Sequence, residues 1–388
     1  MLFNVSIYGF HILLFLVVFN SSLKYMYSSG VWNLLQIILA LFILAITFMD
    51  KKNRVIINPK TLLVIIGLSA ATLVSFFYQY AFYDSKVFFK FITLSLLMFC
   101  GVCYGRHLNV ISFMKISNVF IVVFILYFSV LKIAVMDESA NYLMYSIAIA
   151  FVAVANMGIA FYKDWDGKWL SCGLILLLYC FTLHSRSAIV LPMFFLLFFI
   201  FIDHVKKKKL LKLIGTSSTL IAILGGIAIY SDITLEDLSQ LGYGAYRLIS
   251  MLSGEYADDR GVLLYRSLQL ISDNPLGYGI GAFWSLLGYY PHNFFVETAL
   301  NFGVFVCLGY FVISCIAVIE LSRSRIFILW FYALIYLYYL AAWMTSFDYL
   351  SSFQIHFALG CFISCLSLDV PPSSVALGSR VDPRPKYS

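Results

Sequence analysis

Long apolar runs separated by short polar breaks extend through almost the whole chain. A helix needs about 20 apolar residues to cross the hydrocarbon core of a bilayer. Hydrophobic residues make up 62% of the sequence and charged residues only 12%, and soluble domains do not have this composition. The sequence therefore predicts an all-α, polytopic membrane protein.

The apolar runs are numerous enough for about 12 transmembrane helices. The two runs on either side of residues 184–187 are so close that they are either two spans or one helix that breaks inside the protein. The spans are expected near residues 3–20, 31–49, 61–80, 87–104, 117–135, 142–162, 169–183, 188–202, 213–230, 294–321, 326–345 and 349–368.

Basic residues indicate the orientation of these spans, because short loops rich in Lys and Arg stay cytoplasmic. With the N-terminus inside, alternate loops and the tail hold most of the 26 basic residues, including the tetralysine 206–209. Both termini are then cytoplasmic. The net charge of +7 is a topology signal, and no nucleic-acid binding is inferred from it.

The same orientation places one long polar segment, residues 231–292, on the outer side in the C-terminal half. We therefore predict a single multispanning membrane domain over residues 1–369 that includes this large periplasmic loop. The proline-rich remainder, residues 370–388, is expected to be a disordered cytoplasmic tail.

The second half of the long segment carries the densest polar motifs. Residues 260–272 mix apolar and polar side chains in a way that suits a short helix lying against the membrane. Asn274-Pro275 should end that helix, because the residue before a proline avoids the α region. Gly277, Gly279 and Gly281 then permit turns.

Arginines on the outer side are candidate ligands of a phosphate group, because a guanidinium offers a rigid fork of donors that matches phosphate oxygens. Each could instead pair with an acid or reach lipid headgroups. Arg186 lies between two apolar runs, where an unpaired charge is costly and usually functional. The candidates are Arg186, Arg260 and Arg266, with Arg247 behind them.

His292 is the candidate proton acceptor, since an imidazole can take up a proton near neutral pH without special tuning. A histidine at the start of a helix can also be a cap or an interfacial residue. Asn293 follows directly and Glu297 lies one turn further on, which favours a polar face here. The other five histidines lack such neighbours, and we interpret them as structural.

Metal and nucleotide chemistry find little support in the sequence. All eight cysteines fall inside predicted spans, and Cys100-x-x-Cys103 is more typical of helix packing than of a metal clamp. Asp164-Trp165-Asp166 imitates a metal-binding motif but lies in a short, lysine-flanked cytoplasmic turn. We predict neither a metal nor a cofactor.

Together these motifs resemble the superfamily of O-antigen polymerases (Wzy-type) and O-antigen ligases, which are multispanning enzymes with one large periplasmic loop. The resemblance rests on order and spacing over residues 186–310, and on topology elsewhere. It is carried by Ser185-Arg186-Ser187 at the opening of a span, by Arg266 with Gly277 after it, and by Pro291-His292-Asn293 with Gly303 after it.

The resemblance implies an inverting glycosyl transfer at the outer face of the bacterial inner membrane. Arg186, Arg260 and Arg266 would hold the diphosphate of an undecaprenyl-linked oligosaccharide, and His292 would activate the acceptor hydroxyl. Asn293, Glu297 and Gly277 would support them. Arginines can stabilise the charge of the leaving group without a metal.

The resemblance leaves the acceptor open. A polymerase passes the glycan to a new lipid-linked repeat unit, whereas a ligase passes it to lipid A core. Val306 departs from the small residue or threonine of the ligase pattern, which favours the polymerase. The expected partners are the lipid-linked oligosaccharide, membrane lipids, a chain-length regulator and a flippase.

A lipid-linked oligosaccharide flippase is the alternative from another class of protein. It would also have about 12 spans, but it needs a charged central cavity. Charges deep in the spans here are few, chiefly Lys90, Lys132 and Glu297.

Overall fold

The computed structural model of the protein describes residues 2–20, 29–49, 59–77, 85–135, 142–183, 185–207, 260–346 and 349–366. Within these residues every regular element is a helix and no strand occurs, as the sequence predicts. The predicted span 213–230, Arg247 and the tail 370–388 lie outside the described residues.

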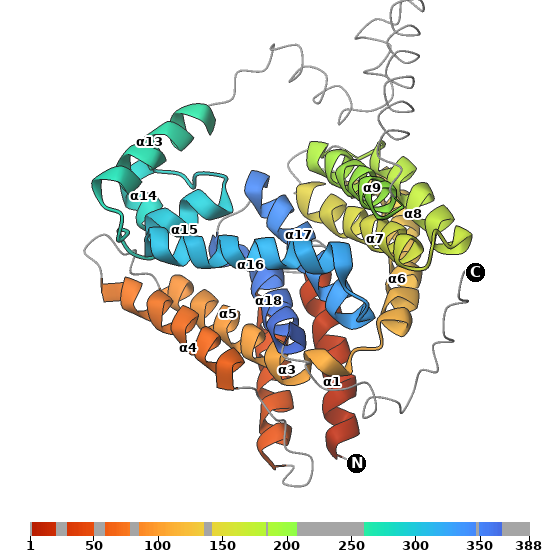
Figure 1. The fold of residues 1–388 in the computed structure, drawn as a ribbon, viewed down its shortest axis with the longest axis horizontal. Coiled ribbons are helices and arrows are strands. Elements are labelled where there is room, and N and C mark those ends of the chain that lie inside the picture. The colour runs from red at the N-terminus through yellow and green to blue at the C-terminus, as the bar shows by residue number, and fades with distance from the viewer. Residues whose placement is uncertain are drawn as a thin grey trace, which may run out of the picture.

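The helices form one assembly in which segments far apart in the sequence lie side by side (Figure 1). Short 3-10 turns, η1 (Ser75–Phe77), η2 (Gly105–His107) and η3 (Tyr349–Ser351), extend or connect some of them. The N-terminal helices are α1 (Leu2–Val18), α3 (Ser29–Met49), α4 (Pro59–Val74), α5 (Ser85–Tyr104), α6 (Val110–Val135), α7 (Tyr142–Tyr162), α8 (Gly167–Cys180) and α9 (Arg186–Lys206). The C-terminal ones are α13 (Arg260–Asp273), α14 (Ala282–Leu287), α15 (Phe294–Phe302), α16 (Val304–Arg323), α17 (Phe327–Ser346) and α18 (Phe353–Leu366).

Five of the described helices are long and apolar enough to cross a membrane, and five further apolar helices are shorter. This confirms a helical, multi-pass membrane protein. The helix α8 ends at Cys180 and α9 begins at Arg186, and both pack against α7. The two neighbouring apolar runs are therefore separate helices.

The predicted single span 294–321 is wrong in one respect, because it is broken at Gly303 into α15 and α16. Gly303 has φ 89° and ψ 166°, a conformation that residues with a side chain rarely adopt. The apolar pattern continues across the break, so hydropathy alone does not reveal it.

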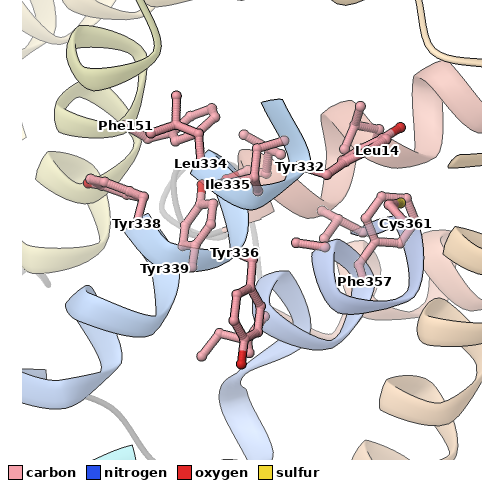
Figure 2. Close-up of a cluster of buried hydrophobic side chains, with 14 of the residues drawn as sticks. Leu14, Phe151, Tyr332, Leu334, Ile335, Tyr336, Tyr338, Tyr339, Phe357 and Cys361 are labelled. Carbon is pink, nitrogen blue, oxygen red and sulfur yellow. Dashed lines mark hydrogen bonds between the residues drawn. The ribbon is translucent and has the colours of Figure 1, made fainter. Parts of the chain in front are cut away.

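The core is centred on α17, which lies between α7 and α18 and is rich in tyrosine (Figure 2). The hydroxyls of Tyr336, Tyr338 and Tyr339 bond to groups on other helices, which satisfies them away from water. Tyr338 donates to the carbonyl of Ile147 at 2.6 Å, and Tyr339 donates to the carbonyl of Val18 at 2.8 Å. The tyrosines thus tie α7 and α1 to α17.

Glycines allow α5 and α18 to pack closely. A Cβ at Gly101 would lie 2.6 Å from the carbonyl oxygen of Phe357, and one at Gly105 would lie 2.8 Å from Cα of Cys361. Small residues at such spacing let the backbones of membrane helices approach each other. Cys100 and Cys103 are buried in this part of α5, which agrees with their predicted role in helix packing.

The helices α13, α14 and α15 gather at one end of the molecule, and α7, α8 and α9 lie at the other (Figure 1). The helix α15 contacts α13, α14, α16 and α17, together with η3. The polar motifs of residues 260–293 therefore lie on or between α13, α14 and α15, and α15 connects them to the rest of the C-terminal helices.

Candidate functional site

The glycine-rich loop after α13 is seated on the break between α15 and α16. The backbone N–H groups of Tyr278 and Gly279 donate to the carbonyls of Leu300 and Asn301 at 2.8 and 3.0 Å. The N–H of Val304 donates in return to the carbonyl of Pro275 at 2.9 Å. These bonds join the loop to the end of α15 and the start of α16.

Two glycines make this contact possible. A Cβ on Gly277 would lie 2.6 Å from the backbone nitrogen of Gly303, and one on Gly303 would lie 2.7 Å from the carbonyl oxygen of Leu276. Both also have positive φ values. Gly277, which we predicted as a supporting residue, therefore acts through its backbone.

The helix α13 ends at Asp273, one residue beyond the predicted range 260–272, and carries Arg266 on its exposed surface. It ends directly before Asn274, whose side-chain amide donates to the carbonyl of Gly277 at 2.7 Å. The hydroxyl of Tyr278 donates to the carbonyl of Leu270 at 3.1 Å. Arg266 is one helical turn from that bond and forms no ion pair with any described residue.

His292 lies immediately before α15 in a left-handed backbone conformation, with φ 53°. Such values are uncommon outside glycine, and they gather at functional sites. The cap of α15 is Asn293, whose side-chain oxygen accepts the N–H groups of Phe295 and Val296 at 3.1 Å each. The capping role considered for His292 therefore belongs to its neighbour.

The side chain of Glu297 points to a different partner from that of Asn293. It is fully buried, and one carboxylate oxygen accepts the backbone N–H of Tyr349 at 2.8 Å. The predicted joint polar face of Asn293 and Glu297 is thus divided: Asn293 caps α15, and Glu297 fastens α15 to the segment between α17 and α18.

A buried polar network continues from Tyr349. Its hydroxyl lies 3.1 Å from that of Tyr310 and 2.9 Å from Nε2 of His356. Nδ1 of His356 lies 3.0 Å from the hydroxyl of Ser352. These neighbours of His356 were not predicted, although Ser352 lies four residues before it. Tyr310 could not be found from local spacing, because it is 46 residues away along the chain.

Replacing Glu297 tests whether this carboxylate holds the helix that follows His292. Glu297→Ala leaves the buried N–H of Tyr349 without that acceptor, which costs about 1–3 kcal/mol. A lower unfolding temperature of the purified protein is expected, by several degrees. Glu297→Gln keeps an oxygen acceptor and should lose less than half as much. An alanine variant that unfolds at the wild-type temperature would contradict this role.

The structure gives partial information on the remaining predicted arginines. Arg186 is the first residue of α9 and Arg260 is the first residue of α13, and for both the backbone alone is described. Arg247 lies outside the described residues. Of the four predicted phosphate ligands, Arg266 therefore has the most completely described surroundings.

Asp166, from the motif that imitates a metal site, caps α8. One of its carboxylate oxygens accepts the N–H of Lys168 at 3.0 Å and that of Trp169 at 3.4 Å. Asp164 and Trp165 form the turn with positive φ values. Asp166 therefore has a structural role as the cap of α8. The described residues contain no group of three or more His, Cys, Asp or Glu that could hold a metal ion.

The candidate site thus consists of the exposed guanidinium of Arg266 on α13, the glycine-rich loop that follows α13, and the imidazole of His292 before α15. A cationic fork can bind a phosphate group, and an imidazole can accept the proton of a hydroxyl. The aromatic rings next to the imidazole were not predicted as site residues. Their signal in the sequence is the pair Tyr289-Tyr290 directly before Pro291-His292.

Residues 172–311 match the sequence family described as O-antigen ligase. The match includes the start of α9, all of α13, α14 and α15, and the loops between these last three helices. The searches of curated proteins and of solved structures gave no significant match.

Proposed function

We propose that this membrane protein is a surface-polysaccharide polymerase, and the match of residues 172–311 to the family described as O-antigen ligase supports this. It would join repeat units carried on undecaprenyl diphosphate. The observation that supports this most directly is the position of His292, which lies before α15 in a left-handed conformation. The glycine-rich loop is bonded to the other end of the same helix.

The reaction is an inverting glycosyl transfer. A hydroxyl oxygen at the nonreducing end of one lipid-linked unit attacks the anomeric carbon of the glycan on a second carrier. The bond between that carbon and the phosphate oxygen breaks, and undecaprenyl diphosphate leaves with the electron pair. His292 accepts the proton of the attacking hydroxyl, which general-base catalysis requires.

Arg266 is the proposed diphosphate ligand with the best-described surroundings. It is exposed, and its helix is tied to the glycine-rich loop through Tyr278 and Leu270. A guanidinium can bind two phosphate oxygens at once and stabilise the charge that develops as the diphosphate leaves. Arg186 and Arg260, with Arg247 behind them, are proposed to complete the site.

The second candidate is an O-antigen ligase, which is favoured by the description of the matched family. A ligase would use the same donor and the same leaving group but would transfer the glycan to lipid A core. Val306 stands where the ligase pattern has a small residue or threonine, and on that basis we propose the polymerase.

The proposed location is the bacterial inner membrane, with both termini in the cytoplasm and residues 231–292 in the periplasm. The membrane domain would comprise residues 1–369, followed by a cytoplasmic tail. Most of the 26 basic residues then lie on the cytoplasmic side, as the positive-inside rule requires. A flippase would supply the lipid-linked units, and a chain-length regulator would limit the product.

Deleting the gene and separating the surface polysaccharide on a gel tests this proposal. Loss of a polymerase should leave single repeat units attached to their acceptor. Loss of a ligase removes attached glycan altogether, and loss of a flippase traps single lipid-linked units inside the cell. A return of the full polymer upon complementation is expected, and either of the other two patterns would contradict the polymerase assignment.

A further inference from the structure

Three aromatic side chains lead away from His292 along the loop that precedes it. The rings of Tyr290 and His292 have centroids 4.2 Å apart, and Tyr289 stacks on Tyr290 at 4.6 Å with an interplanar angle of 21°. Trp284 meets Tyr289 edge to face at 6.2 Å. We call Trp284, Tyr289 and Tyr290 the aromatic ladder.

The two ladder residues that are further from His292, Trp284 and Tyr289, have partly exposed side chains. Trp284 is 41% exposed and Tyr289 is 44% exposed, although large aromatic residues are usually well covered. Phe283, which is fully buried, anchors the base of the ladder beside Trp284 at 5.4 Å. The polar tips of Trp284 and Tyr289 have no hydrogen-bond partner among the described residues.

The backbone holds the ladder in a fixed shape. The short helix α14 carries Trp284 and lies between Gly281 and Gly288, which have φ values of 71° and 74°. His292 adds a third left-handed turn after Tyr290. These turns bring Trp284, Tyr289 and Tyr290 together on one side of the loop, where their rings contact one another.

The ladder also lies in an uncharged stretch of chain, because residues 274–293 contain no Asp, Glu, Lys or Arg. A diphosphate would not be recognised there. A sugar ring would be, since its C–H bonds present an apolar face that packs on an aromatic ring. Its hydroxyls can meet the indole N–H and the phenol groups, which makes Trp and Tyr suitable amphipathic surfaces.

We propose that the aromatic ladder is a binding subsite for a sugar ring of the acceptor glycan, next to the hydroxyl that reacts. This rests on the proposed function, because it gives the acceptor a place beside His292. Exposed Trp and Tyr can also anchor a protein at the membrane surface. The direct ring contact of Tyr290 with His292 favours the sugar.

The test measures binding without catalysis. The probe is the repeat-unit oligosaccharide released from its polyprenyl carrier by mild acid, titrated onto the full-length protein in nanodiscs and followed by saturation-transfer NMR. Trp284→Leu and Tyr289→Leu keep an apolar side chain but remove the flat ring. Each should raise the Kd about five- to tenfold, which is typical of losing one aromatic contact.

Two control variants distinguish the sugar subsite from a membrane anchor. Trp284→Phe keeps a ring and should stay within about twofold of the wild-type Kd. Phe305→Leu changes an exposed aromatic of α16 outside the ladder and should leave the Kd unchanged. Wild-type Kd values in both leucine variants, with easier extraction from membranes, would show an anchor and overturn the proposal.

Failure of this inference can be told apart from failure of the proposed function. If the wild-type protein polymerises lipid-linked units but both leucine variants bind the oligosaccharide normally, the acceptor sugar lies elsewhere. If the wild-type protein binds the oligosaccharide through the aromatic ladder but joins no repeat units, the result supports the sugar subsite and contradicts the polymerase assignment.

Discussion

His292→Asn is expected to lower the turnover of the purified protein about 10²- to 10⁴-fold, the usual loss when a general base is removed. Asparagine tolerates the left-handed conformation that His292 adopts with φ 53°, so the backbone should be retained. Binding of the lipid-linked donor should stay close to normal.

Two further variants separate chemistry from backbone conformation at this position. His292→Gly adopts a positive φ without strain, whereas His292→Ala adds roughly 1–2 kcal/mol of conformational cost. If His292 supplies a base, all three variants are inactive although their stabilities differ. Wild-type turnover in the asparagine and glycine variants would show that only the left-handed turn matters.

Arg266→Ala is expected to abolish polymerisation at normal expression, because it removes the charge that stabilises the departing diphosphate. Arg266→Lys keeps a positive charge but loses the planar fork, so it should recover only part of the activity. The measurement is the length distribution of surface polysaccharide in complemented deletion cells, with the amount of protein in the membrane checked in parallel.

Gln269→Ala is the matched control for Arg266, since it alters another exposed side chain of α13 without changing charge. It should give wild-type polymer. Full-length polymer in the Arg266→Ala cells would remove Arg266 from the diphosphate site. Loss of polymer in the Gln269→Ala cells would show that the whole surface of α13 is sensitive for another reason.

The end of α13 and the turns after it could be predicted from the sequence to within one residue, because local rules decide them. Asn274-Pro275 directly follows the end of the helix, and Gly277, Gly279 and Gly281 all have positive φ values. The rules for the residue before proline and for glycine act over a few residues. No knowledge of the tertiary fold is needed at these positions.

The break at Gly303 could not be predicted from hydropathy, because both sides of it are apolar. It exists because the loop at Pro275 and Leu276 occupies the space that a side chain at Gly303 would need. That contact joins residues that are distant in the sequence. The partner of Glu297 was hidden for the same reason, since Tyr349 lies beyond two further helices.

The roles of neighbouring residues in the His292 motif also required the fold. The sequence favours one polar face made by Asn293 and Glu297, next to His292. In the structure their roles differ, because His292 forms a left-handed turn, Asn293 caps α15 and Glu297 accepts the N–H of Tyr349. Spacing along a helix indicates which side chains can meet, but not which partners they choose.

Reconstitution can decide whether this chain joins lipid-linked units by itself. The purified protein is placed in vesicles with undecaprenyl-diphosphate-linked repeat units as the only substrate, and both the glycans and the released carrier are measured. We predict a series of longer lipid-linked glycans, with one undecaprenyl diphosphate released for each new linkage. Units that stay single under these conditions but are transferred once lipid A core is added would contradict the polymerase assignment.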